Sequence, residues 1–99
     1  MLRLVYVNRM LKPILPRFIE MRRADLIEMT NAINQSDFNY FRDLSHRLLG
    51  TPGTFGFHYL VKLAKLIEIA ALNRDLDQLK KIKNKYEYFL KSHKVIFIP

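Results

Sequence analysis

The spacing of apolar residues is the feature that most constrains how this chain folds. From Leu15 onward they recur in steps of three and four residues, which places them on one face of an α-helix. The first stripe comprises Leu15, Phe18, Ile19, Leu26, Met29 and Ile33. No segment alternates with a sustained period of two, and no internal repeat is apparent. The pattern predicts an all-α fold.

Three further stripes follow the first. They comprise Phe38, Phe41, Leu44, Ser45 and Leu48; Leu60, Leu63, Ala64, Ile67 and Ala71, in a helix that starts near Phe57; and Leu76, Leu79, Ile82, Tyr86, Phe89 and Leu90. Turns are expected at 34–37 and 73–75, with Ser36 or Asp37 and then Asp75 as N-caps. Four helices of about 15 to 18 residues with short loops predict an up-down-up-down antiparallel bundle over about residues 14–92, in a single domain 1–99.

The two ends of the chain are expected to be accessory to this bundle. Residues 2–11 could form a short lead-in helix, which Pro13 would end or kink. The C-terminal VIFIP is β-branched and apolar but is too short to form a sheet by itself. We expect it to pack over the end of the bundle or to fray.

Composition excludes several classes of protein. With no cysteine among 99 residues, the chain has no disulfide, thiolate nucleophile or cysteine zinc site. No apolar run approaches the roughly 20 residues of a membrane span, and the first residues lack the apolar core and cleavage site of a signal peptide. We therefore expect a cytoplasmic domain with its own core.

The formal charge of +8 predicts an acidic partner without identifying it. Nucleic acid, an anionic membrane surface and an acidic protein pocket would all fit. Six lysines crowd the last twenty residues: Lys80, Lys81, Lys83, Lys85, Lys91 and Lys94. Amphipathic helices place lysines on their solvated face, so this run does not by itself indicate a binding site.

One histidine stands out from the apolar pattern. On the second predicted helix His46 lies about 140° from Phe41, outside the apolar stripe, and should face solvent. Arg42 shares its face, as do Gly50 and Gly53 if the helix continues that far. Bare backbone beside an exposed histidine suggests the close approach of a large partner. The alternative is that the glycines merely form a loop and His46 is an ordinary surface residue.

A family resemblance favours the functional reading. The run HRLLGTPGTFGF, residues 46–57, resembles the signature of histidine-containing phosphotransfer (HPt) domains. Its GTFGF ending is similar to the phosphotransfer domain of chemotaxis histidine kinases. The run LVKLAKLIE, residues 60–68, resembles the next helix of the family, with its acidic residue at the end. The resemblance covers about residues 14–90.

The resemblance implies roles for individual residues. His46 would accept the phosphoryl group, and Gly50 and Gly53 would leave room for the donor. Glu68 falls where the family's acidic residue hydrogen-bonds or orients the histidine. Geometry supports this position independently, because Glu68 ends a line of residues along the third predicted helix and could reach the helix of His46: Phe57, Val61, Ala64 and Glu68.

One position departs from the family pattern. The lysine expected three residues after the histidine, which helps to hold the phosphoryl oxygens, is Leu49. Arg42, Arg47 and Lys65 are candidate substitutes, with Arg42 best placed because helical side chains lean toward the N-terminus. Pro52 inside a helix would remove a backbone hydrogen bond, so we expect a kink or a helix end near it.

The resemblance implies a phosphoryl carrier rather than an enzyme. The expected route runs from an aspartyl phosphate on one response-regulator receiver domain to His46 and on to another receiver, with a hybrid histidine kinase as a further possible partner. The receiver would supply Mg²⁺, so the chain itself needs no cofactor. It has no P-loop or kinase-type glycine loop for ATP. We expect a monomer that binds neither nucleic acid nor membrane.

Two other interpretations draw on single features. A basic helical module that binds nucleic acid, or docks on a protein without phosphotransfer, would account for the charge, although no recognition motif accompanies it. A metal site formed by His46, His58 and His93 would need ligand spacings that match no compact motif. We therefore predict no metal and expect His58 and His93 at the surface.

Overall fold

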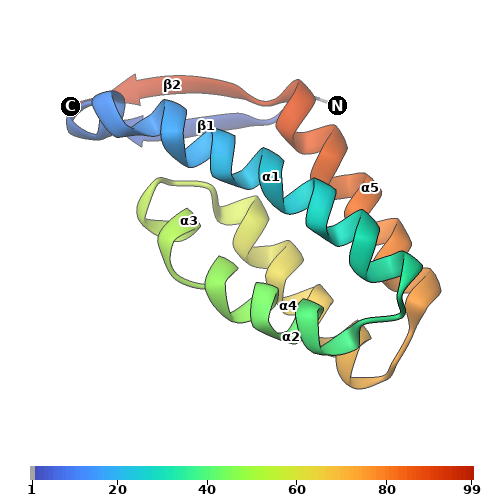
Figure 1. Ribbon diagram of the computed structural model, residues 1–99. Helices are drawn as coiled ribbons and strands as arrows, with labels where there is room; N and C mark the ends of the chain where they lie inside the picture. The colour runs from blue at the N-terminus through green and yellow to red at the C-terminus, as the bar shows by residue number, and fades with distance from the viewer. Residues whose placement is uncertain (1) are drawn as a thin grey trace.

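The computed structural model describes residues 2–99 and contains four long helices with a small sheet near one end (Figure 1). In chain order the elements are β1 (Leu4–Asn8), the 3-10 helix η1 (Arg9–Ile14), α1 (Leu15–Asn34), α2 (Phe38–Leu48), α3 (Thr51–Thr54), α4 (His58–Leu72), α5 (Leu76–Ser92) and β2 (Lys94–Ile98). The four long helices predicted from the apolar stripes are present.

Two of the long helices begin at capping residues that the sequence indicates. The side chain of Asp37 accepts a hydrogen bond from the backbone N–H of Tyr40, and that of Asp75 accepts one from Gln78, each at 3.1 Å. These carboxylates satisfy N–H groups that have no partner within the first turn of a helix. Asp37 and Asp75 are therefore confirmed as N-caps, of α2 and α5.

The long helices bury their apolar stripes against one another. The main packing pairs are α2 with α4, α1 with α5, and α4 with α5. In Figure 1 the chain reverses direction between consecutive long helices. The largest fully buried side chains come from these helices, from the turn before α4 and from β1, and include Tyr86, Phe41, Phe57, Phe89 and Met29. None of the helices in residues 2–99 combines the length and apolar character that spanning a bilayer requires.

The helix break near Pro52 was expected, but its position changes the geometry around His46. Helix α2 ends at Leu48, the chain turns through Leu49 and Gly50, and α3 then forms a single turn over Thr51–Thr54. Pro52 is buried within α3. The predicted helix end is confirmed. The alternative in which one continuous helix carries His46, Gly50 and Gly53 on a single face is wrong.

The two ends of the chain form a sheet, which corrects the all-α prediction. β1 and β2 pair in parallel with Leu4 opposite Lys94 and Asn8 opposite Ile98. The lead-in helix predicted for residues 2–11 is therefore wrong over Leu4–Asn8, which form β1. The following Arg9–Ile14 form a 3-10 helix that contains Pro13. The C-terminal segment does not fray: it forms β2, and Val95 packs against the core, as one of the two expected outcomes has it, whereas its pairing with β1 was not expected. Each strand was too short to pair alone, and the helices bring the two together.

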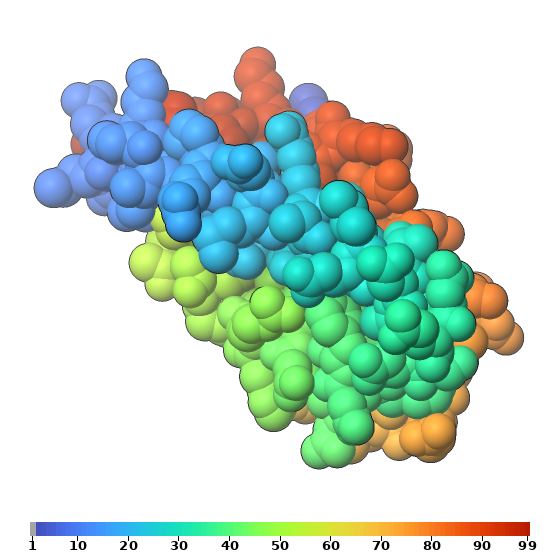
Figure 2. Space-filling view, in the orientation of Figure 1, coloured from blue at the N-terminus to red at the C-terminus, as the bar shows by residue number. Residues whose placement is uncertain are grey.

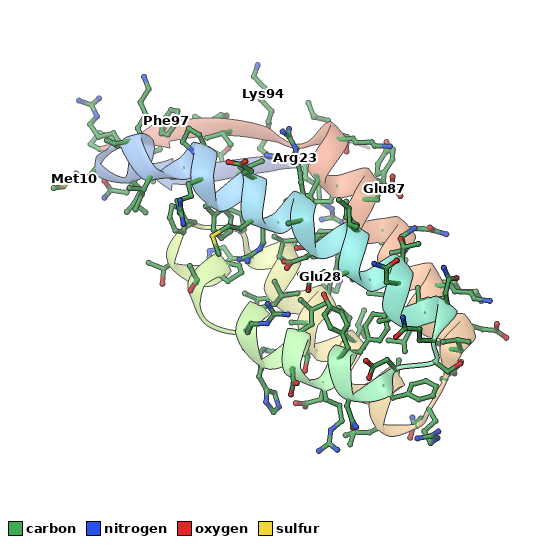
Figure 3. The ribbon with its side chains drawn as sticks, in the orientation of Figure 1. Met10, Arg23, Glu28, Glu87, Lys94 and Phe97 are labelled. Atoms are coloured by element: carbon green, nitrogen blue, oxygen red, sulfur yellow. The ribbon has the colours of Figure 1, made fainter. Side chains whose placement is uncertain are left out.

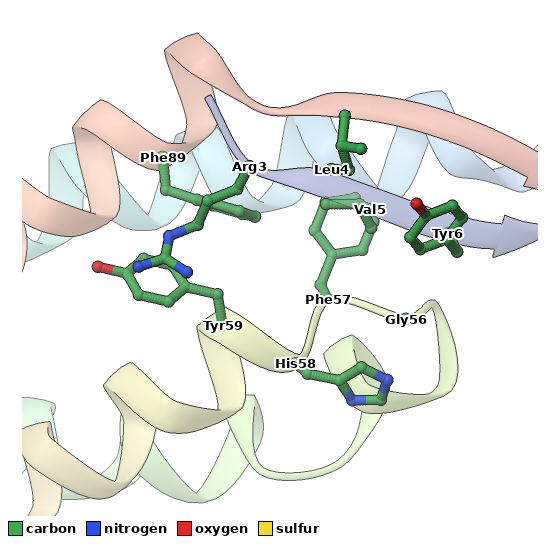
Figure 4. A pocket seen from close by; sticks show the side chains of 9 residues that line it. All are labelled: Arg3, Leu4, Val5, Tyr6, Gly56, Phe57, His58, Tyr59 and Phe89. Atoms are coloured by element: carbon green, nitrogen blue, oxygen red, sulfur yellow. The ribbon is translucent and has the colours of Figure 1, made fainter. Parts of the chain in front are cut away.

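Gly56 lets this sheet approach the bundle. It has a φ of +84°, and a Cβ atom at this position would overlap the carbonyl oxygen of Tyr6 in β1. Figure 4 shows Phe57, the next residue, pointing toward Val5 beneath the strand. Both of these side chains are buried. The last glycine of the GTFGF run therefore has a packing role, which the sequence did not reveal.

Candidate functional site

His46 lies in the last turn of α2 and points away from the core. The apolar face of this helix buries Phe41, Leu44 and Leu48 together with Ser45, and the imidazole projects from the other side. Its side chain is 66% exposed. The predicted exposure of His46 is confirmed, and a partner can reach the ring directly.

Helix α4 brings a carboxylate to this histidine. Glu68 follows the buried Ile67 and lies one turn after the buried Ala64, at the edge of the α4 face that packs against α2. Its Oε2 is 3.2 Å from Nε2 of His46, and its side chain is 41% exposed. The sequence predicted that Glu68 could reach the His46 helix, and the structure shows this contact.

The contact gives the imidazole a defined chemistry. A neutral ring that donates Nε2–H to Glu68 keeps its lone pair on the other nitrogen, which can act as a nucleophile. If that nitrogen forms a bond and the ring becomes cationic, the negative charge of the Glu68 carboxylate stabilises the cation. Both groups are well exposed, so water competes for the hydrogen bond and the pair contributes little to stability.

The two glycines singled out near His46 differ in their surroundings. A Cβ atom on Gly50 would have no heavy atom within 4 Å, so its backbone borders open space. A Cβ atom on Gly53 would be 3.6 Å from Cγ2 of Val61, an ordinary van der Waals distance. Room for an approaching partner is therefore found at Gly50, whereas Gly53 lies against α4.

The three candidate substitutes for the missing lysine also differ in their surroundings. Arg42 is exposed one turn before His46, and Lys65 is exposed one turn before Glu68. Arg47 has its guanidinium carbon 5.9 Å from the centre of the Tyr40 ring and lines a cavity bordered by α1. Leu49, at the position of the family lysine, is 39% exposed. Arg42 and Lys65, each one helical turn before a member of the His46–Glu68 pair, stay candidates for the cation near His46.

The other two histidines have different environments. His58 is exposed at the start of α4. His93 is half-buried, with Nδ1 3.0 Å from the carbonyl oxygen of Phe89, and its ring packs against Phe57 and Phe89. His93 is therefore only partly exposed, and its ring contributes to packing, which its predicted surface position did not include. Within residues 2–99 no group of three histidine or acidic side chains is arranged to hold a metal ion.

A buried polar cluster between α1 and α5 was missed by the sequence analysis. Arg22 Nε lies 2.8 Å from Oδ2 of Asp25, and the Tyr86 hydroxyl donates to the same oxygen at 3.1 Å. Burial raises the pKa of the Asp25 carboxyl, although Arg22 and Tyr86 oppose this shift. The signal in the sequence was an arginine and an aspartate three residues apart, interrupting the apolar stripe of α1.

The lysine-rich helix α5 packs on α1 and α4, away from α2 and His46. Two of its lysines flank Glu87, with the Nζ of Lys91 3.0 Å and that of Lys83 4.0 Å from its carboxylate oxygens. The hydrogen bond from Lys91 lowers the pKa of Glu87, which Figure 3 labels. The basic surface and the histidine site therefore belong to different parts of the bundle.

Comparison with known proteins identifies the family. The family model described as "Hpt domain" matches residues 13–90. Neither the curated proteins nor the solved structures that were compared gave a match. Hpt domains are phosphocarriers that interact with kinases and response regulators. Because the match spans most of the chain and includes the helices that carry His46 and Glu68, this chain belongs to the Hpt domain family, which serves histidine phosphotransfer in two-component signalling.

Proposed function

We propose that His46 is the phosphorylated histidine and that the protein relays the phosphoryl group between the receiver-domain aspartates of two response regulators. The observation that carries this proposal is the 3.2 Å contact between Nε2 of His46 and Oε2 of Glu68 at an exposed position. A histidine used only for packing would be buried, and an ordinary surface histidine would lack a carboxylate from a neighbouring helix.

The first half-reaction needs only a nucleophile from this chain. The ring nitrogen that Glu68 does not hold attacks the phosphorus atom of an aspartyl phosphate, and the bond from phosphorus to the aspartate oxygen breaks. The aspartate leaves as a carboxylate, and the ring keeps its N–H on Glu68. The ring becomes cationic, and the carboxylate stabilises it. Reversal of these steps on a second receiver regenerates neutral His46.

The partner supplies the rest of the site. Mg²⁺ bound in the receiver domain would neutralise charge on the phosphoryl oxygens, which is the main requirement of phosphoryl transfer. The open space beside Gly50 gives the receiver room to approach. Arg42 and Lys65 are exposed near the pair and would offer a cation to the roughly two negative charges of the phosphoryl group.

Mapping of the phosphate label tests the acceptor. The full chain, His46→Gln and the matched control His58→Gln are incubated with a phosphorylated receiver domain, and the acid-labile label is located by mass spectrometry under neutral conditions. We expect label on His46 in the parent and in His58→Gln, and none in His46→Gln. Labelling of His46→Gln equal to the parent would refute the assignment.

A second transfer step tests the relay. The labelled protein, freed of its donor, is mixed with a panel of unphosphorylated receivers. We expect at least one receiver other than the donor to take the label from His46 faster than it is lost to water. If the label returns only to the donor, the multistep relay is wrong although His46 is still the acceptor.

A further inference from the structure

A cavity of about 440 Å³ lies between α1 and the α2–α3 segment. Figure 2 shows the surface of α1 above the green surface of α2 and α3. Three arginines line it, Arg17 and Arg22 from α1 and Arg47 from α2, together with the hydroxyl-bearing Thr51. Among the described residues that line it, none is acidic. A cavity of this size is within the range of small-molecule sites, and its polar groups are positively charged.

Arg22 indicates that the cavity is prepared for an anion. Its side chain is only 8% exposed, and its hydrogen bond within the described part of the chain goes from Nε to Asp25. A guanidinium has five N–H donors, so four of them, on the two terminal nitrogens, are left to face the cavity it lines. These terminal nitrogens are not among the enclosed polar atoms of the described residues, so a molecule in the cavity can reach them, and a carboxylate or phosphate matches the guanidinium fork in two hydrogen bonds.

Two aromatic rings line the cavity beside these arginines. The rings of Phe18 and Phe55, both lining residues, are stacked with centroids 4.4 Å apart and planes inclined by 18°. The guanidinium carbon of Arg22 lies 5.1 Å from the Phe18 ring centre. The charged and apolar walls are therefore adjacent. An anion with a flat apolar body can contact both, whereas an inorganic ion would leave the aromatic wall unused.

We propose that this cavity binds a small organic anion, with its carboxylate or phosphate group on Arg17, Arg22 and Arg47 and its apolar body against Phe18 and Phe55. The ligand would supply the acceptors that Arg22 lacks within the fold. The site uses neither His46 nor Glu68, so it is separate from the proposed phosphoryl acceptor and does not depend on that assignment.

Titration with defined probes tests the chemistry of the ligand. Phenylphosphonate and benzoate carry both features, benzyl alcohol carries the ring alone, and methylphosphonate carries the charge alone. Each is added to the full chain and followed by calorimetry and by the backbone amide resonances of residues 14–22 and 47–55. We expect saturable binding of both aromatic anions, and affinity at least about tenfold lower for benzyl alcohol and methylphosphonate.

Matched arginine variants locate the site. Arg17→Gln and Arg47→Gln each remove an exposed lining cation while leaving the buried pair of Arg22 intact. Arg23→Gln is the control, because Arg23 is exposed on the same helix without lining the cavity and lies in Figure 3 on the side of α1 away from α3. We expect phenylphosphonate to bind about tenfold more weakly to Arg17→Gln and Arg47→Gln and equally well to Arg23→Gln.

Several results would overturn the proposal. These are no saturable binding of either aromatic anion to the parent, affinity for benzyl alcohol equal to that for phenylphosphonate, or an equal loss of binding in Arg23→Gln. Binding to His46→Gln serves to separate the two sites. Unchanged affinity in that variant supports a distinct cavity, and its loss would place the anion at the phosphotransfer histidine instead.

Discussion

Two polar clusters link neighbouring helices of this bundle, and they differ most in exposure. His46 and Glu68 connect α2 to α4 with side chains that are 66% and 41% exposed. Arg22 and Asp25, with Tyr86, connect α1 to α5 with side chains of the ion pair that are 8% and 6% exposed. The exposed pair leaves one ring nitrogen accessible to a partner, whereas the Arg22–Asp25 contact and the Tyr86 hydroxyl that bonds Asp25 lie in the interior.

The difference separates a polar pair that a partner can reach from a polar cluster inside the fold. Water competes for the exposed pair, so its loss changes the free energy of unfolding little. Removing one member of the buried cluster leaves a charge and a hydroxyl without partners, which is strongly destabilising. We therefore expect substitutions at the first pair to act on phosphotransfer and substitutions at the second to act on folding.

The largest expected effect follows from the buried cluster. Asp25→Ala leaves Arg22 and the Tyr86 hydroxyl without their acceptor and should lower the free energy of unfolding by about 3–5 kcal/mol. Glu68→Ala, the matched change in the exposed pair, should lower it by about 0–1 kcal/mol and should slow phosphotransfer. Urea unfolding at one temperature and rapid-quench transfer on both variants measure the two effects. Equal destabilisation by the two variants would break the comparison.

Gly56 and Gly50 allow a similar comparison, between a residue needed for packing and one that borders the open space near His46. Gly56→Ala should cost about 1–3 kcal/mol, because φ is +84° and its Cβ atom would overlap Tyr6. Gly50→Gln faces open space, so it should leave the free energy of unfolding unchanged within about 0.5 kcal/mol while slowing transfer from a receiver. Thermal unfolding and transfer kinetics are measured on both. Unchanged transfer in Gly50→Gln would show that the bare patch is only a turn.

Removing the cation near His46 should have a smaller effect, confined to the rate of phosphoryl transfer. Arg42→Ala should slow transfer several-fold, about the loss of one charge-assisted hydrogen bond. Arg47→Ala should slow it less, because Arg47 lies toward Tyr40 and the α1 cavity. Leu49→Lys should partly rescue Arg42→Ala. Rapid-quench transfer from one phosphorylated receiver compares them, and an Arg42→Ala variant as fast as the parent would assign the cation to Lys65 or to the partner.

The smallest expected effect is the pH dependence of the buried cluster. Burial raises the pKa of Asp25 in the folded state above its value in the unfolded chain. Its contribution to stability is therefore fully present below the unfolded pKa and is lost as pH rises through the raised folded pKa. The free energy of unfolding of the parent, relative to Asp25→Asn, should fall as pH rises from about 3 to 7. A difference that stays constant or increases with pH would contradict this sign.

Apolar periodicity and helix capping, which depend on nearby residues, were sufficient to predict much of the site around His46. The three- and four-residue periodicity defined which face of α2 is buried, and so predicted that His46 is exposed. The same periodicity placed Glu68 at the edge of the α4 core stripe, within reach of α2. Asp37 and Asp75 marked helix starts because a carboxylate beside an apolar stripe satisfies the free N–H groups of a first turn. These inferences depend on neighbours within about one or two turns of helix.

Contacts between distant segments decided the rest. β1 and β2 lie at opposite ends of the chain, and neither LVYVN nor KVIFI specifies a partner until the helices bring them together. Gly56 became necessary only because β1 passes over it. The direction of Arg47, the cavity beside α1 and the burial of Asp25 against Tyr86, 61 residues away, likewise depend on how helices pack. Periodicity tells which face of a helix is buried, but the neighbour that covers it is set by the summed packing of the whole chain.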